Sequence, residues 1–291
     1  MDDKIRKSHH SLSAELLCEI KNVSAPFEHT TDMHNHTNHE ILIVKRGRIN
    51  LFTDHAGIEL TRGDVALIPM YKFHRGEILT PTEYDRIVIN VTENVLQNAS
   101  YEQYDLNKCF KPYNDKQIHT AHLNEDELEE IDLYSSLLLD NLYSTSAESE
   151  ILTDSYFKLI MVMINRKYRK NELSLSEDKM PDIVKKTFNY IDKHLTEEIT
   201  LKALEDEIHN NGTYISRCVK KISGLSLSQY IIAKRIALAC RLLREGSTAN
   251  EACYQSGFNN YSNFSRTFTK QVGVSPKQFQ IEYRKGVIDN K

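Results

Sequence analysis

The chain has 291 residues, of which 40% are hydrophobic and 27% are charged. A typical domain size of roughly 100–200 residues predicts two or three domains, and the composition excludes a disordered or collagen-like chain. The longest strongly apolar stretch, Leu159–Ile164, is far shorter than the ~18 residues that a membrane helix needs. The charged first residues do not resemble a signal peptide. We therefore expect a cytoplasmic protein with no membrane partner.

The net charge of −4 hides a difference between the two parts of the chain. Residues 1–180 carry 20 Lys and Arg against 30 Asp and Glu, a net charge of −10. Residues 181–291 carry 17 Lys and Arg against 11 Asp and Glu, a net charge of +6. A basic half joined to an acidic half suggests different partners, the basic one meeting a polyanion. Chance clustering of solvated charge is the alternative.

The five cysteines show no paired spacing. The closest two, Cys240 and Cys253, lie too far apart for a C-x-x-C zinc or redox pair. An odd number of cysteines without a secretion signal indicates reduced thiols. Cys218, Cys240 and Cys253 sit inside apolar patterns, so we expect them to be small buried hydrophobic residues.

Short β-type runs follow the first thirty residues, for which we expect irregular structure. The runs are rich in Val, Ile and Leu and are separated by turn residues: Glu40–Val44, Ile49–Thr53, Asp64–Ile68 and Ile87–Val91. Strands of about five residues at such intervals are typical of a β-sandwich or a small barrel. Residues 1–110 are therefore expected to form an all-β domain.

The hydrophobic period then changes from two to between three and four. Over Glu125–Tyr143 the inward positions are expected at Leu128, Ile131, Ser135, Leu138 and Leu142, and a similar pattern covers 151–169. Both segments are predicted to be amphipathic helices. A polar stretch, Asn171–Lys179, follows and is interpreted as a linker.

The first of these helices also carries a second apolar strip at Leu133 and Leu137. One face is therefore expected to pack on the β domain and another to meet a second copy of the chain. We place the dimer seam at Leu138 and Leu142. A helix that packs only within its own chain is the alternative.

Almost everything after Pro181 follows a helical pattern in which one arrangement occurs twice. A short helix, a tight turn, a longer helix and a glycine span Leu201–Gly224 and again Ala249–Gly273. Aligning the copies on Arg217 and Arg266 pairs residues of the same kind: Ile215 with Phe264, Val219 with Phe268, Lys221 with Lys270, and Gly224 with Gly273. Each copy predicts a helix-turn-helix.

The second helix of each copy presents polar side chains opposite its apolar ones. They are Thr213, Ser216, Arg217 and Lys220 in the first copy, and Ser262, Ser265, Arg266 and Thr269 in the second. Tyr261, which begins the second copy's longer helix, is added to the candidate set. A recognition helix presents its outward N-terminal residues to base edges in the major groove, and arginine reads guanine with two hydrogen bonds. We expect these residues to contact DNA. Ordinary surface residues on a pair of α-hairpins are the alternative.

Residues from about 183 to 284 resemble the DNA-binding domain of the AraC/XylS family of transcription regulators. The resemblance rests on Lys234–Ala239 between the two motifs, on Ala252–Phe268, and on Gly273–Phe279. It implies that the two recognition helices occupy successive segments of the major groove. The helix over 227–244 would hold them about one turn of DNA apart.

A histidine-rich motif precedes the first predicted strand. His34, His36 and Glu40 follow the pattern H-x-H-x-x-x-E. Residues two apart share a face of a strand, so these three side chains are expected to point into the β domain, whereas His39 points away. Two imidazoles and one carboxylate on one face could bind Fe, Mn, Zn or Ni.

This spacing resembles the first motif of the cupin barrel, a common effector domain of the same family. The second cupin motif is partly present, because Gly63 and Pro69 have the right separation and His74 could supply a fourth ligand. Tyr71 and Ile78 depart from it. Three roles remain open for His34, His36, Glu40 and His74: metal binding, contact with an organic effector, or structural hydrogen bonding.

These observations predict a two-domain, ligand-responsive transcription regulator rather than an enzyme. It has an N-terminal cupin-like barrel (1–110), a helical dimerisation and linker region (111–180), and a C-terminal all-α double helix-turn-helix domain (181–291). The implied partners are promoter double-stranded DNA, a second copy, an unidentified small-molecule effector and RNA polymerase. The cofactor is unknown, with a divalent metal as one candidate.

Two other functions remain open. One is a metal-dependent cupin enzyme fused to a DNA-binding domain, and the other is a constitutive DNA-binding protein with a structural cupin. We find no Ser/His/Asp order, phosphate loop or carboxylate pair that points to another enzyme.

Overall fold

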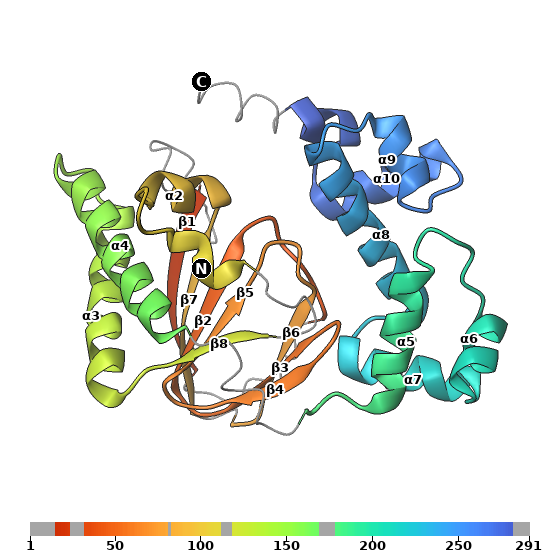
Figure 1. Ribbon diagram of the computed structural model, residues 1–291, viewed down its shortest axis with the longest axis horizontal. Helices are drawn as coiled ribbons and strands as arrows, with labels where there is room; N and C mark the ends of the chain where they lie inside the picture. Colours follow the sequence, from red (N-terminus) through yellow and green to blue (C-terminus); the bar gives the residue numbers. More distant parts are fainter. Residues whose placement is uncertain (1–14, 24–31, 81–82, 112–117, 169–177, 282–291) are drawn as a thin grey trace, which may run out of the picture. The chain divides into compact units, whose positions relative to one another are not determined.

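The computed structural model describes residues 15–23, 32–80, 83–111, 118–168 and 178–281. The chain divides into two compact units (Figure 1). The first comprises Met1–Thr30 and Asn35–Lys179, and the second comprises Thr31–His34 and Met180–Lys291. The expected succession of a β-rich part and a helical part is confirmed.

The described strands of the first unit form two antiparallel sheets. A five-stranded sheet has the order β1-β7-β2-β5-β8, and a three-stranded sheet has the order β4-β3-β6. The strands are β1 Leu16–Val23, β2 His39–Arg46, β3 Ile49–Thr53, β4 Gly57–Leu60, β5 Asp64–Ile68, β6 His74–Ile78, β7 Tyr84–Val91 and β8 His119–His122. Pairing among the described strands stays within these two sheets, so the domain is a jelly-roll-like sandwich rather than a closed barrel.

Four of these strands were not expected from the sequence. β1 shows that the first thirty residues are not irregular throughout, because Leu16 and Cys18 are buried while Leu17 and Glu19 are exposed. In the sequence itself, apolar and polar residues alternate only from Cys18 to Lys21, which is a short period-two signal. β4, β6 and β8 have only four or five residues each, which is too short for a period to stand out.

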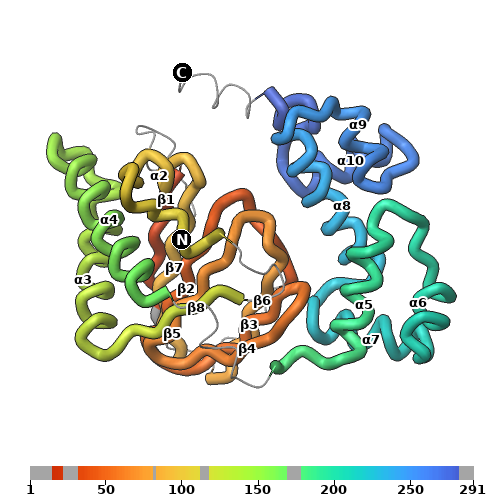
Figure 2. The backbone as a smooth tube through the Cα atoms, in the orientation of Figure 1, coloured from red at the N-terminus to blue at the C-terminus, as the bar shows by residue number. Residues whose placement is uncertain are grey.

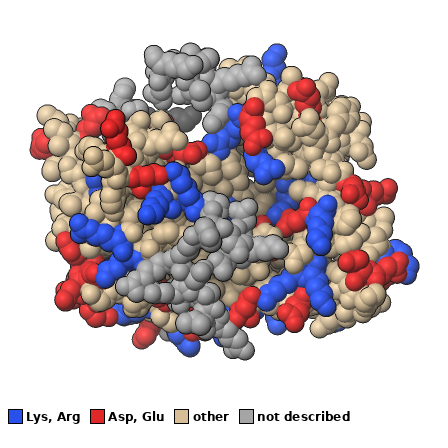
Figure 3. Space-filling model, in the orientation of Figure 1, with Lys and Arg blue, Asp and Glu red and all other residues tan. Residues whose placement is uncertain are grey.

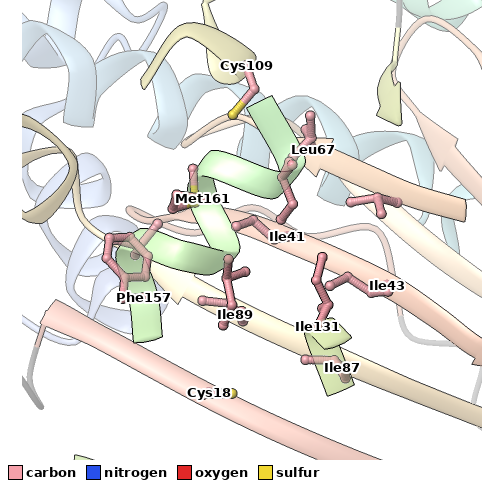
Figure 4. Packing of buried hydrophobic residues seen from close by; sticks show 14 of the residues in the cluster. Cys18, Ile41, Ile43, Leu67, Ile87, Ile89, Cys109, Ile131, Phe157 and Met161 are labelled. Carbon is pink, nitrogen blue, oxygen red and sulfur yellow. The ribbon is translucent and has the colours of Figure 1, made fainter. Parts of the chain in front are cut away.

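The five-stranded sheet has two apolar faces because both are covered. Ile41 and Ile43 of β2 join a core with Ile131 of α3 (Glu125–Leu142) and Phe157 of α4 (Ser149–Lys167), as Figure 4 shows. The same core includes residues of two shorter elements, α2 (Glu93–Ala99) and the 3₁₀ helix η1 (Leu106–Phe110). The intervening residues of β2, Leu42 and Val44, belong to a second core with Leu51 and Leu60 of the three-stranded sheet. Successive side chains of a strand alternate between faces, so β2 is hydrophobic at every central position.

The helix α3 buries the side chains at which we had placed a dimer seam. Leu138 is 0% exposed and Leu142 is 8% exposed, and both belong to the core shared with the sheet and α4. The seam predicted at these residues is therefore wrong. On the outward face, Leu133 is 57% exposed.

The second unit consists of short helices joined by tight turns, which can be followed along the tube in Figure 2. They are α5 Asp182–Lys193, α6 Leu201–Ile208, α7 Gly212–Ser223, α8 Leu227–Arg244, α9 Ala249–Gln255 and α10 Tyr261–Val272, and residues 276–281 are also helical. The predicted helices are confirmed. Ser226 and Thr248 begin α8 and α9 with capping boxes, in which side chain and backbone satisfy each other's free groups.

Two further points concern the chain as a whole. The linker expected over Asn171–Lys179 lies mostly outside the described residues. None of the described helices is both long and apolar enough to cross a lipid bilayer.

Candidate functional site

The first recognition helix, α7, separates its apolar and polar residues cleanly. Ile215 and Val219 are fully buried, whereas Thr213, Arg217 and Lys220 are exposed, and Ser216 is half-buried. The predicted DNA-contacting residues of this motif therefore share one accessible face.

Two contacts define where α7 begins. The side chain of Asn211 accepts a hydrogen bond from the Thr213 N–H at 3.0 Å, and the carboxylate of Glu205 on α6 accepts one from the Gly212 N–H at 2.6 Å. These bonds satisfy backbone donors that a helix start leaves open. A Cβ at Gly212 would lie 2.5 Å from Leu201 Cγ, so the turn between α6 and α7 needs a glycine here.

The second recognition helix, α10, has the same division with larger buried side chains. Phe264 and Phe268 are fully buried, and the Phe264 ring lies 5.2 Å from that of Phe258 and 5.6 Å from that of Phe268. Arg266 is exposed on the opposite face. Tyr261 is also exposed, at the start of the helix, where its ring lies 6.0 Å from that of Phe264. Aromatic packing thus supports the helix that carries the second predicted set.

The outward side chains of α10 line one surface hollow. They are Tyr261, Ser262, Ser265, Arg266, Thr269 and Lys270. Five of them were predicted, and Lys270 was not assigned. Its signal was present in the repeat, because the register pairs Lys270 with Lys221. Hydroxyls, an arginine and a lysine on one helix face are suited to base edges and phosphates.

Two contacts modify what these faces can offer to DNA. The guanidinium of Arg217 lies over the Tyr214 ring, 5.6 Å from its centroid, which is a cation–π distance. The hydroxyl of Thr269 donates to the Ser265 carbonyl at 2.8 Å. Thr269 therefore presents only acceptor lone pairs to a base or a bound water.

Lys234 and Arg235 begin the segment Lys234–Ala239, on which the family resemblance partly rests, and both have a structural role. Lys234 Nζ lies 2.7 Å from a carboxylate oxygen of Asp192, and Arg235 Nε donates to the Leu195 carbonyl at 2.9 Å. Burial lowers the pKa of Arg235. These contacts tie α8 to the end of α5, so the two cations hold the helical unit together.

Charge on the surface is mixed rather than separated. On the face of the molecule in Figure 3, basic and acidic side chains are interspersed. The net charge of +6 over residues 181–291 does not form one continuous basic field on that face. The case for DNA binding therefore rests on the helix faces themselves.

A second cluster of polar side chains lies at one end of the sandwich. His36 Nε2 is 2.9 Å from Glu40 Oε2, and His74 Nε2 is 3.7 Å from the same oxygen. One ligand atom from each of the three residues lies within 4.8 Å of the others. The structure thus brings together three of the four residues expected from the cupin-like motifs.

The fourth residue, His34, does not join this group. It is exposed, its Nδ1 lies 2.8 Å from the Asp32 carbonyl, and its segment groups with the second unit. The strand begins only at His39, so the period-two rule does not extend back to His34.

The environment of Glu40 favours its charged form. Burial alone would raise the pKa of this carboxyl, but hydrogen bonds and positive charge from His36 and His74 outweigh burial and hold the pKa well below its usual range. Glu40 therefore contributes a negative charge to the end of the sandwich.

His39 points away from Glu40, as expected, but not into solvent. It is 5% exposed, and its ring lies 4.4 Å from the Phe110 ring. The face of β2 that carries His39 is covered by η1 and the helices of the first unit. His39 is therefore part of the core, although it points away from Glu40.

Two helix-turn-helix motifs in one helical unit, joined to a β-sandwich, define the class of the protein as a two-domain DNA-binding regulator. The family described as "AraC-like ligand binding domain" matches residues 25–158. The family described as "Helix-turn-helix domain" matches residues 204–281.

Several known proteins are similar to this chain. The HTH-type transcriptional activator RhaS of Escherichia coli is 21% identical over 258 residues, covering 85% of this chain and 86% of RhaS. The uncharacterized HTH-type transcriptional regulator YobQ of Bacillus subtilis is 37% identical over 92 residues, or 31% of this chain and 38% of YobQ. The crystal structure of ToxT from Vibrio cholerae with bound unsaturated fatty acid aligns with 94% of this chain and 97% of ToxT, at 14% identity and a TM-score of 0.41.

The chain belongs to the AraC/XylS family of transcription regulators. Its N-terminal unit is the family's ligand-binding domain and its helical unit is the DNA-binding domain.

Proposed function

We propose that the protein regulates transcription by placing α7 and α10 in successive major-groove segments of promoter DNA, in response to a small molecule bound by the sandwich. The observation that carries this proposal is the pair of exposed, arginine-bearing faces on two helices of matching register. α8 has 18 residues and is therefore about 27 Å long. That length is close to the rise of one turn of DNA, about 34 Å.

The side chains suggest a division of labour within each face. Arg266 and Arg217 have the reach and geometry to read guanine, and Thr269 offers acceptors to an amino group on a base edge. Lys220 and Lys270 lie further along their helices and are suited to phosphate contacts, which orient a protein without reading sequence.

We also propose that the protein acts as a homodimer in the cytoplasm and meets RNA polymerase at the promoter. The supporting feature for dimerisation is the outward side of α3 and α4, where large apolar residues are exposed: Leu133, Ile151 and Leu159 at 57%, 69% and 44%. Covering these side chains with a second copy would remove their apolar area from water, which is favourable. A Leu133→Asp, Ile151→Asp double variant should sediment as a monomer, and an unchanged dimer would place the interface elsewhere.

The experiment that tests the DNA proposal is selection of bound sequences from random double-stranded DNA by the full-length protein. The enriched sequence should contain two short blocks centred about 10 base pairs apart, because each helix reads one groove segment. The double variant Ser262→Ala, Arg266→Ala should lose preference at one block only, and Ser216→Ala, Arg217→Ala at the other. Selection of a single block, lost in both variants, would contradict the proposed arrangement.

The remaining alternatives predict different results in other measurements. A constitutive DNA-binding protein would show the same affinity with and without any metabolite, whereas a sensor changes its affinity with its effector. A cupin enzyme would consume a small molecule without DNA present, and we propose that the protein is not an enzyme.

A further inference from the structure

The first helix of the first motif contributes a carboxylate to the start of the second helix. Glu205 of α6 is half-buried, and its Oε1 accepts a hydrogen bond from the Gly212 N–H at 2.6 Å. Gly212 is the first residue of α7, so its N–H points out of the helix end and finds no carbonyl within α7. The carboxylate therefore occupies the position at which the start of a helix binds an anion.

The two helices approach each other closely at this point. A Cβ on Gly212 would lie 2.5 Å from Leu201 Cγ and 2.8 Å from Glu205 Oε1, and Gly212 itself is buried. Leu204 and Ile208 anchor another side of α6 in the interior, because both are buried. The apolar stripe thus holds α6 in place, and Glu205 ties this fixed helix to the first turn of α7.

The second motif, all of which is described, has a different pair of residues at these two places. In the register of the two copies, Tyr254 stands at the place of Glu205, and Tyr261 stands at the start of the following helix. Tyr254 is 58% exposed, and a phenol carries no charge at neutral pH. The side chain of Tyr261 also takes up the space that Gly212 leaves open. The carboxylate is therefore a property of α7 and not of the repeat.

The position of Glu205 matters because of how a helix-turn-helix meets DNA. The first helix crosses the phosphate backbone, and the second enters the major groove with its N-terminal residues in front. The junction between α6 and α7 is therefore the part of the motif that lies near phosphates. Thr213, the next residue after Gly212, is exposed and belongs to the predicted DNA-contacting set. A phosphate and the Glu205 carboxylate would compete for one N–H and repel each other.

We propose that Glu205 is a specificity-determining residue of the first motif, which fixes the start of α7 against α6 and keeps DNA phosphates away from it. A helix start without the carboxylate would bind the phosphate backbone of any sequence. With Glu205 in place, α7 depends on the base contacts proposed for Ser216 and Arg217. This inference rests on the proposed function and gives a role to a residue outside the two recognition helices.

The test compares two variants of the full-length protein by fluorescence anisotropy. The DNAs are the selected duplex, the same duplex with the block read by α7 scrambled, and random DNA. Glu205→Gln removes the charge but keeps an oxygen acceptor for the Gly212 N–H. It should bind all three DNAs about two- to fivefold more tightly, the range expected for one exposed charge interaction. Its preference for the α7 block should not change.

Glu205→Ala removes the acceptor as well as the charge. It should also bind random DNA more tightly, and its preference for the α7 block should fall by about fivefold, while its preference for the α10 block stays the same. Unchanged affinity of Glu205→Gln for random DNA, or an unchanged α7-block preference of Glu205→Ala, would overturn the proposal. If Glu205→Ala loses preference for both blocks, its fold is disturbed and the result for Glu205→Gln alone decides.

Two controls come from the chain itself. Glu207→Gln removes a charge from an exposed position of α6, two residues away and so on a different side of the helix. It should change the affinity for random DNA by less than about twofold, and a rise equal to that of Glu205→Gln would overturn the proposal. Tyr254→Ala alters the matching place in the second motif and should leave the α10-block preference unchanged. Wild-type selection without two blocks would contradict the proposed function, whereas two blocks with unaffected Glu205 variants would contradict only this inference.

Discussion

The two helix-turn-helix motifs share a register but differ in what lies beneath and beside their recognition helices. α7 rests on Ile215 and Val219, whereas α10 rests on Phe264 and Phe268 at the matching positions. α7 also follows an acidic helix, in which Glu205 is hydrogen-bonded to the Gly212 N–H. The repeat therefore preserves the outward chemistry of the motif while its core has diverged, and we expect α10 to be the more rigid and the stronger DNA reader.

The largest expected effect concerns the cores of the two motifs. Phe268→Ala should destabilise the helical unit by about 3–5 kcal/mol, because it removes a fully buried ring and leaves a cavity. Val219→Ala removes two methyl groups at the matching position and should cost about 2 kcal/mol. Chemical denaturation of the full chain, followed by circular dichroism, measures both values. Equal losses would show that the two cores are equally important.

The next effect concerns the two arginines. Arg266→Ala should weaken binding to the selected sequence by about 1–3 kcal/mol and have little effect on random DNA. Arg217→Ala should cost less, because its guanidinium must leave the Tyr214 ring to reach a base, and that contact is worth about 0.5–1 kcal/mol. Fluorescence anisotropy with both DNAs measures the difference. Arg241→Ala, at an exposed position of α8, is the control. A larger loss for Arg217→Ala would reverse the ranking of the motifs.

One lysine from each motif, Lys220 and Lys270, should act as a phosphate contact, although the register pairs Lys270 with Lys221. Lys220→Ala and Lys270→Ala should each lower the slope of log K against log salt concentration by about 0.9, because each removes one phosphate contact and the counterion that it releases. Affinity should fall equally for selected and random DNA. Lys202→Ala is a suitable control, because Lys202 Nζ lies 2.8 Å from a carboxylate oxygen of Asp206 on α6. An unchanged slope in Lys270→Ala would remove this residue from the interface.

The smallest effect is chemical and distinguishes the motifs without DNA. Burial raises the pKa of Cys240 to about 12 and also raises that of Cys253 beneath the second turn. A raised pKa keeps a thiol protonated, and the thiolate is the reactive form. Iodoacetamide at pH 8 should therefore modify the half-buried Cys218 of α7 first. Mass spectrometry of the cysteine-containing peptides measures the order in which the thiols are alkylated. Faster labelling of Cys253 would mean that the second motif opens more readily than the first.

The second unit could be predicted almost completely from the sequence. Helical periodicity, capping residues and turn glycines act over three or four positions along the chain. α8 therefore has the predicted bounds, and α6 and α9 begin at the residues where the two repeats were predicted to begin. The same local rule placed Arg217 and Arg266 on outward faces. Which face of such a helix is accessible follows from its own apolar stripe.

The first unit depended on contacts between residues far apart in the chain. The sequence by itself determined that strands lie around 40–91 and that His36 and Glu40 share a site. Only the tertiary structure decided that His74 completes this site while His34 does not, since the pairing of β6 and the start of β2 are not local properties. Burial of His39 and Leu138 was likewise decided by packing, because a period shows that a residue faces one side of an element but not what covers that side.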